Sequence, residues 1–199
     1  MIGNLTTTKM KTFLSIVMIS TIALLAFGQD QKAAVPKEPK TKLEAFEART
    51  GAVIIRGFST VGTIRGRYET SVEIECKEFT DASSGKREFG ISIEVKQAGR
   101  IERKDSAYID YDEIDSLVKG IEYISKIEKS VTKLDQFQAD YKTKGELRVS
   151  TFSDDSGKIQ TAIHSGQFGG VSAYLSLEDL ASFKKLIQQA KEKLDFIKG

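Results

Sequence analysis

The chain has 199 residues, of which 40% are apolar and 29% charged, and it contains two prolines. This composition predicts a folded chain and excludes collagen-like, low-complexity and wholly disordered proteins. The chain has one cysteine, one histidine and no tryptophan. A disulfide framework is therefore excluded, and little material remains for zinc sites or for catalysis by Cys/His or Ser/His pairs.

The N-terminus has the layout of a secretory signal peptide. Lys9 and Lys11 precede an apolar run over residues 13–25, and small residues at 26 and 28 occupy the −3 and −1 positions of a cut before Gln29. The run is shorter than the roughly 18 to 20 residues that a membrane-spanning helix needs. We expect residues 1–28 to be a cleavable signal peptide and the protein to be secreted or periplasmic, with no transmembrane segment after cleavage and with Met10 as an alternative start.

Export changes the charge balance of the protein. Removing the signal peptide takes away Lys9 and Lys11 and no acidic residue, so 28 of the 30 basic residues remain against 28 acidic ones. The mature chain is formally neutral. Export and neutrality together disfavour nucleic acid or an anionic membrane as the partner.

A flexible linker is predicted over residues 29–42. This segment holds both prolines and only one branched apolar residue, Val35, so it cannot bury enough surface to become ordered. Thr41 and Glu44 then form a capping pattern, followed by apolar residues at 43 and 46 and by Gly51. These residues predict a short helix over 42–50.

Alternating apolar and polar residues predict strands through the first half of the domain. They cover residues 52–58, a long stretch over 63–77 with a bend near Gly66 or Thr70, residues 89–95, and a short strand ending at Ile109. Cys76 falls on the apolar face of this pattern and is expected to be a buried, inert thiol. Asp110 and Glu113 resemble a capping box for a helix whose apolar stripe continues to Ile127.

The second half repeats this order of elements. Strands are predicted at 136–142, 146–152, 158–164 and 168–175, followed by a helix over 177–197 that Ser176 caps and Asp179 closes.

Self-comparison of the chain indicates an internal duplication. Residues 79–86 match 152–158 with one residue dropped, which puts Ile91 opposite Ile163, and the helix entry at 107–109 matches 173–175. The first copy is longer by six residues between Gly85 and Ala107, and we place that surplus at a hairpin tip near 97–100.

A single sheet with one helix is too small to be stable alone. The prediction is therefore an α+β domain of two tandem units, each an antiparallel sheet plus a C-terminal helix (about ββββα), packed with pseudo-twofold symmetry. The first repeat covers residues 43–131 and the second covers 132–199.

The polar turn at 154–158 and the segment 173–180, which leads into a long amphipathic helix, resemble the ββββα unit of the whirly and PUR families. This resemblance implies binding of single-stranded nucleic acid on a sheet surface. The helix entry, a tyrosine followed by acidic residues and leucine, is also similar to that of uncharacterised secreted bacterial proteins, and this second likeness implies no function.

Three arginines form the candidate ligand-binding group: Arg56, Arg65 and Arg67. No acidic residue lies between Arg49 and Glu69, and guanidinium groups suit phosphate, a sulfated glycan or nucleic acid. The alternative is a solvated sheet face balanced by the glutamates that follow. His164 ends a predicted strand, and with no second histidine it is expected to have a structural or solvent-facing role.

The sequence predicts an exported, non-enzymatic binding protein or an envelope-associated structural protein, whose ligand is a protein, a glycan or a small molecule. The alternative is a sheet-surface binder of single-stranded nucleic acid or another polyanion. A third hypothesis is a hydrolase that uses a pair of acidic residues brought together by folding. No cofactor, metal or catalytic residue is predicted.

Overall fold

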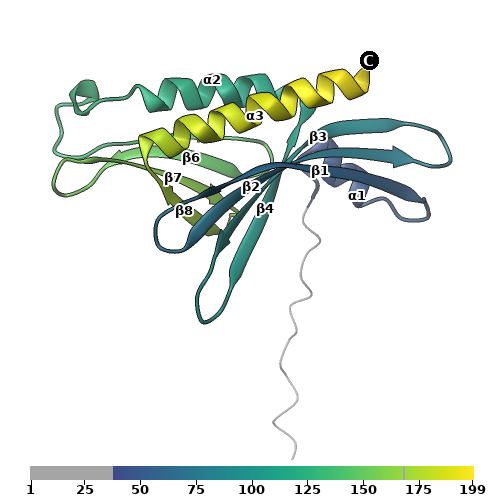
Figure 1. The fold of residues 1–199 in the computed structure, drawn as a ribbon, viewed down its shortest axis with the longest axis horizontal. Coiled ribbons are helices and arrows are strands. Elements are labelled where there is room, and N and C mark those ends of the chain that lie inside the picture. The colour runs from purple at the N-terminus through teal and green to yellow at the C-terminus, as the bar shows by residue number, and fades with distance from the viewer. Residues whose placement is uncertain (1–37, 168) are drawn as a thin grey trace, which may run out of the picture. The chain divides into compact units, whose positions relative to one another are not determined.

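The computed structural model describes residues 38–167 and 169–199 and has the predicted α+β architecture. Two four-stranded antiparallel sheets have the strand orders β1-β2-β3-β4 and β5-β6-β7-β8. Helices α2 and α3 lie side by side over the sheets (Figure 1). The predicted signal peptide and residues 29–37 of the predicted linker lie outside the described residues.

The elements of the first repeat are the following: α1 Lys42–Glu47, β1 Ile54–Arg65, β2 Thr70–Asp81, β3 Arg87–Gln97, β4 Arg103–Asp110 and α2 Ile114–Ser125, with a 3-10 turn at Tyr111–Glu113. A 3-10 turn at Lys129–Val131 ends the first repeat. The elements of the second repeat are the following: β5 Gln138–Lys142, β6 Leu147–Ser153, β7 Ile159–Ser165, β8 Val171–Leu175 and α3 Leu177–Lys198.

The first sheet corrects one part of the strand prediction. β1 is a continuous strand of 12 residues with a register shift between Thr60 and Gly62, whereas the alternation pattern broke it into two pieces. The pattern failed because β1 is an edge strand with glycines and many exposed residues. The predicted bend is confirmed, since a tight turn in which the Thr70 N–H donates to the Arg67 carbonyl (3.2 Å) separates β1 from β2.

Helix α1 covers one end of the first sheet on the side away from α2 and α3. Its predicted capping box is present between Thr41 and Glu44. Its buried residues Leu43 and Phe46 pack against Phe79 of β2. Helix α1 begins at Lys42 as predicted, and it ends at Glu47, three residues before the predicted end.

The predicted capping role of Asp110 and Glu113 is wrong. The Asp110 carboxylate accepts hydrogen bonds from the backbone N–H groups of Lys42 (2.9 Å) and Leu43 (3.2 Å), the first residues of α1. The Glu113 carboxylate accepts from the Lys144 N–H at 2.9 Å. Helix α2 therefore starts at Ile114 behind a 3-10 turn, because both carboxylates bind segments that are distant in sequence.

At α3 the capping prediction is confirmed. The Ser176 hydroxyl accepts from the Asp179 N–H, and the Asp179 carboxylate accepts from the Ser176 N–H, both at 3.1 Å.

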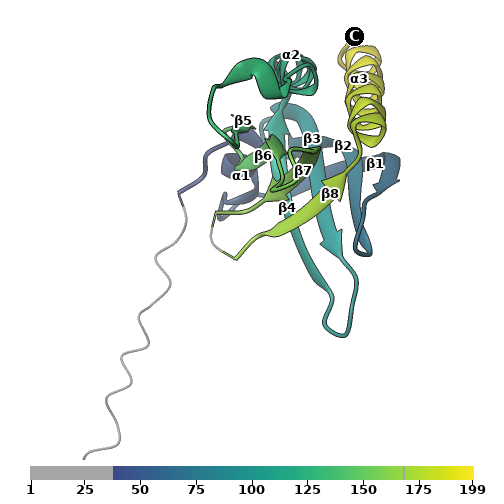
Figure 2. The same ribbon diagram turned by 90° about the vertical axis from the view of Figure 1, so that its left-hand side faces the viewer.

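Each long helix packs mainly on the sheet of the other repeat. Helix α2 lies on β5 and β6, where Gly120 lets its backbone approach the ring of Tyr141, and α3 lies on β1 and β2 (Figure 2). The Cys76 thiol of β2 contacts the Ala190 carbonyl of α3 at 3.5 Å. One apolar cluster includes residues of both sheets and both helices. The two repeats therefore share a core in a reciprocal way, as pseudo-twofold packing requires.

The two copies of the polar turn have the same hydrogen-bond pattern. In each, one aspartate oxygen accepts from the backbone N–H (2.9 Å) and the hydroxyl (2.6 Å) of a serine two residues later, Ser83 for Asp81 and Ser156 for Asp154. Gly85 and Gly157 close the two turns with positive φ angles of 67° and 78°. The duplication is thus visible in local geometry.

The strand register corrects the alignment of the two copies. Ile93 pairs with Ala107, and Ile163 pairs with Ala173, so Ile93 and not Ile91 is the counterpart of Ile163. Relative to the second copy, the first has two extra residues between the turn glycine and this isoleucine, and four in the β3-β4 hairpin. Only part of the surplus therefore lies at the predicted hairpin tip.

Candidate functional site

The three predicted arginines do not form one group. Arg56 and Arg65 lie near opposite ends of β1, so about 30 Å separates them at the usual rise of an extended strand. The Arg56 Nε atom lies 3.5 Å from a carboxylate oxygen of Glu47. Arg67 instead reaches the second sheet, where its guanidinium donates to the Gln160 side chain at 2.6 Å.

At Arg67 the two repeats meet along strand β8. The Arg67 N–H donates to the Tyr174 carbonyl at 2.8 Å, which forms an isolated antiparallel bridge. The adjacent Tyr68 ring lies edge-on to the Tyr174 ring, with centroids 5.8 Å apart and planes at 85°. Two exposed tyrosines, one from each repeat, therefore stand side by side at the edge of the second sheet.

The second sheet presents four polar side chains in one line across its strands. Lys142 pairs with Arg148, Arg148 with His164, and His164 with Ser172. Neighbours along these strands, such as Val149 and Ile163, are buried in the core, so alternation points the four polar side chains to the opposite face. We call these four residues the basic row and the sheet surface that bears them the open face.

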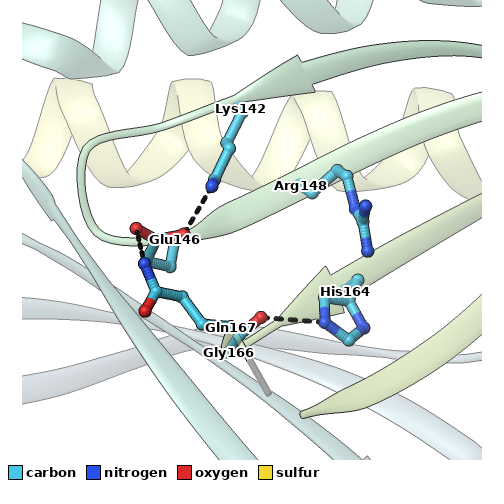
Figure 3. A pocket seen from close by; sticks show the side chains of 6 residues that line it. All are labelled: Lys142, Glu146, Arg148, His164, Gly166 and Gln167. Carbon is cyan, nitrogen blue, oxygen red and sulfur yellow. Dashed lines mark hydrogen bonds and ion pairs between the residues drawn. The ribbon is translucent and has the colours of Figure 1, made fainter. Parts of the chain in front are cut away.

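A hollow of about 260 Å³ opens at the basic row (Figure 3). Its lining residues are Lys142, Glu146, Arg148, His164, Gly166 and Gln167. The side chains come from β5, β6 and β7 and from the segments that follow β5 and β7.

Buried Glu146 anchors one wall of this hollow. Its carboxylate accepts from Lys142 Nζ (2.7 Å) and Gln167 Nε2 (2.8 Å) and pairs with Lys40. Hydrogen bonds from Lys142 and then Lys40 lower the pKa of Glu146 to about 2. The carboxylate is therefore an anion that pairs with Lys142, its neighbour in the hollow, as well as with Lys40.

Arg148 is the cation of the hollow that remains without such a partner. Among the described residues its guanidinium has no ion pair or hydrogen bond, and it lies beside the His164 ring (Figure 3). Guanidinium groups bind carboxylate, sulfate and phosphate through paired N–H donors. The hollow therefore has the chemistry of a small anion site.

His164 is fixed by hydrogen bonds on both ring nitrogens. Nε2 lies 2.8 Å from the Gly166 carbonyl, and Nδ1 lies 2.9 Å from the Ser172 hydroxyl. Because a carbonyl only accepts, Nε2 carries a proton, and Nδ1 of the neutral ring accepts from Ser172. The His164 ring, which forms part of the wall of the hollow, is therefore held in one orientation.

A second hollow of about 290 Å³ contains Ser172, whose hydroxyl is hydrogen-bonded to His164 of the first hollow. Its lining residues are Tyr68, Thr70, Gln97, Arg103, Gly170, Ser172 and Tyr174. Arg103 donates to the carbonyls of Gly169 (2.7 Å) and Gly170 (3.0 Å) and so connects the β3-β4 hairpin to the segment before β8. We call this the tyrosine hollow and the first one the Arg148 hollow.

Other reactive groups lie away from these hollows. Burial raises the pKa of the Cys76 thiol, which agrees with the inert role expected for it. Within residues 38–167 and 169–199, no three His, Cys, Asp or Glu side chains are grouped to hold a metal ion. No helix in this part of the chain has the length and apolar character needed to cross a bilayer.

Comparison of the chain with protein-family models, with curated proteins and with solved structures gives no match. The resemblance to the whirly and PUR families stays a prediction.

Sequence reasoning missed the basic row because its members come from four strands. Lys142, Arg148 and Ser172 carry no motif, and only His164 drew attention. The strand register would have found them. When the internal repeat is used to align β6 and β7 with β2 and β3, the outward-facing residues of β6 and β7 fall opposite one another.

Proposed function

We propose that this protein is an exported, non-enzymatic binding protein whose ligand is negatively charged and docks on the open face of the second sheet. This proposal is carried by the guanidinium of Arg148, which has no partner among the described residues and lies in a hollow whose other polar side chains are hydrogen-bonded. A preformed hollow with a few fixed polar groups is typical of ligand recognition.

The hydrogen bonds of His164 leave neither ring nitrogen free to take a proton directly from a ligand in the hollow. Both ring nitrogens are engaged, and the Nε2 proton is directed at a backbone carbonyl and not into the hollow. A general base that acts directly on a bound ligand needs such a free nitrogen. Here the ring supports the hollow and positions Ser172.

Export rests on the pattern of residues 1–28 and has its own test. We expect N-terminal sequencing of the chain recovered outside the cytoplasm to begin at Gln29. A cytoplasmic chain that retains residues 13–25 would contradict export.

Binding is tested with immobilised heparin, polygalacturonate, a single-stranded oligodeoxynucleotide and neutral dextran. We expect at least one anionic polymer to bind and dextran not to bind. Arg148→Ala should weaken the interaction about tenfold or more, as the loss of charge-assisted hydrogen bonds predicts. Arg87→Ala is the matched control, because Arg87 is exposed on the first sheet and paired with Glu78; it should change affinity less than about twofold. Failure of all anionic polymers to bind, or equal effects of the two variants, would overturn the proposal.

The Ser172–His164 hydrogen bond is the one contact at this site that favours a different function. A serine next to an imidazole is the pairing used in nucleophilic catalysis. We expect no hydrolysis of p-nitrophenyl acetate above the buffer rate and no labelling by a fluorophosphonate. Hydrolysis that disappears in Ser172→Ala would show an enzyme and overturn the binding proposal.

A further inference from the structure

We infer that the ligand is a short acidic glycan, with its carboxylate or sulfate in the Arg148 hollow and a neighbouring sugar ring against the tyrosines of the tyrosine hollow. This inference rests on the proposed function and adds the ligand class and a second contact region.

The two hollows are spaced for one short ligand. Arg148 and Ser172 lie two strands apart, and Tyr174 lies two residues further along β8. At about 4.8 Å between strands and about 3.4 Å per residue, Arg148 and Tyr174 are roughly 12 Å apart. A few linked sugars span such a distance, whereas a single ion does not.

The tyrosine hollow has the surfaces that a sugar ring needs. Tyr68 is 72% exposed and Tyr174 is 40% exposed, so aromatic surface is available to the C–H face of a sugar. The side chains of Gln97 and Ser172 line the same hollow and supply donors and acceptors for sugar hydroxyls. Aromatic surface with a few polar groups at its edge is a common arrangement in binding sites.

The backbone at Tyr68 supports a role for its exposed ring. Tyr68 and Glu69 both have positive φ angles, 57° and 56°. Tight hairpin turns of this kind favour Asn-Gly, and a bulky residue there costs about 1 kcal/mol. A strained conformation that holds an aromatic ring in solvent is more often found at a functional site than elsewhere.

Three observations favour a glycan over nucleic acid. The two tyrosine rings are perpendicular, so they do not offer parallel platforms to successive bases. Arg148 is the only member of the basic row with a permanent, unpaired charge. On the corresponding face of the first sheet, glutamates such as Glu75 and Glu94 are paired with Lys77 and Lys104, so the described residues offer no continuous basic strip across both repeats for a long polyanion.

The test is isothermal titration of the full-length chain with four probes. They are a galacturonic acid trisaccharide, its neutral methyl ester, a short heparin oligosaccharide and a thymidine trinucleotide. We expect at least one acidic sugar to bind about tenfold more tightly than the neutral ester. The galacturonate and heparin arms distinguish a carboxylate from a sulfate ligand.

Variants separate the two hollows. Arg148→Ala should weaken binding of the acidic sugar about tenfold and abolish the difference between acid and ester. Tyr174→Ala should weaken acid and ester by the same factor, about threefold to tenfold, and Tyr174→Phe should restore most of the affinity. Tyr123→Ala is the control, because Tyr123 is as exposed as Tyr68 but lies on α2.

The outcomes distinguish this inference from the proposed function. If the trinucleotide binds in an Arg148-dependent way and the sugars do not, the glycan inference is wrong and the binding function stands. If acid and ester bind equally in the wild type, the anion site is wrong. If no probe binds here and no polymer binds in the previous experiment, both fail.

Discussion

The outward faces of the two sheets differ, although the two sheets have the same strand order and matching polar turns. On the first sheet, α1 covers one end, and two glutamates of the remaining surface are paired: Glu75 lies 2.5 Å from Lys77, and Glu94 lies 3.5 Å from Lys104. No helix packs on the open face of the second sheet among the described residues, and the unpaired guanidinium of Arg148 lies there.

This difference separates what the duplication keeps from what it changes. The buried register, with Ile93 and Ile163 paired to Ala107 and Ala173, is the same in both copies. The outward positions on the same strands carry glutamate–lysine pairs in the first copy, whereas in the second copy Arg148 and His164 line a hollow. Core positions must fit each other, whereas outward positions face water and can change freely. We therefore infer that binding specificity resides on the open face of the second sheet.

The largest expected effect tests whether the two sheets truly share one core. Phe183 of α3 is completely buried, so Phe183→Ala should lower the free energy of unfolding by about 3–5 kcal/mol. Hydrogen exchange should accelerate in both sheets together, since α3 covers the first sheet but belongs to the second repeat. Phe196→Ala is the control, because Phe196 is 88% exposed on the same helix. Loss of protection in one sheet alone would show two independent cores.

Removing the carboxylate of Glu146, which anchors one wall of the Arg148 hollow, should have the next largest effect. Glu146→Gln leaves Lys40 and Lys142 without an anionic partner and should cost about 2–3 kcal/mol at neutral pH. Since the pKa of Glu146 falls from an ordinary value near 4.5 to about 2 in the fold, its ionised form stabilises the protein above pH 4.5. That contribution is lost as the pH falls from 4.5 to 2.

Urea unfolding at a series of pH values measures this. The curves of wild type and Glu146→Gln should converge toward pH 2. Glu102→Gln changes an exposed glutamate whose ion pair with Lys96 is 4.0 Å long, and it should leave the profile of the wild type unchanged within about 0.5 kcal/mol. A constant difference between wild type and Glu146→Gln across this pH range would contradict the assignment.

A smaller effect on stability is expected from releasing α1 from the first sheet. Asp110→Ala removes the acceptor of the Lys42 and Leu43 N–H groups and should cost about 1–2 kcal/mol. Hydrogen exchange should accelerate in α1 while β6 and β7 stay protected. Asp112→Ala breaks an exposed pair with Lys42 and should change stability by less than about 0.5 kcal/mol. Equal effects of the two changes would show that Asp110 does not hold α1.

The smallest expected changes in stability come from substitutions in two turns. Glu69 has a positive φ angle in the turn next to the tyrosine hollow, so Glu69→Gly should raise stability by about 0.5–1 kcal/mol. Gly157→Ala, in the polar turn of the second sheet, should lower stability by about 1 kcal/mol, because alanine is strained at a φ angle of 78°. Thermal unfolding measures both changes, and a loss of stability in Glu69→Gly would show that the backbone at 69 is not strained.

Local patterns were enough to predict most elements of the fold. Alternation located β2, β3, β6 and β7, and serine and threonine caps located the starts of α3 and α1, because these signals depend on neighbours in sequence. The errors at Asp110, at Glu113 and along β1 arose where tertiary contacts, and not neighbours in sequence, determine the local structure. A carboxylate before a helix has the same local pattern whether it caps that helix or binds a segment about 70 residues away.

The candidate site was harder to predict for the same reason. Arg67 was identified, but its partner Gln160 lies 93 residues away. Arg148 has no motif around it. It stands out as a candidate anion-binding residue because Lys142 is paired with Glu146, whereas Arg148 has no such partner among the described residues. Pairing across strands is a property of register, which sequence reasoning had misplaced by two residues in the first copy.

The most direct test of the central claim is backbone amide NMR of the full-length chain during titration with the galacturonic acid trisaccharide and, in parallel, the heparin oligosaccharide. Saturable chemical-shift changes at Arg148, His164 and Tyr174, with little change at Glu73 and Glu94, are the predicted result. Changes centred on the first sheet, or none at the basic row with either sugar, would contradict the claim that the open face of the second sheet binds the ligand.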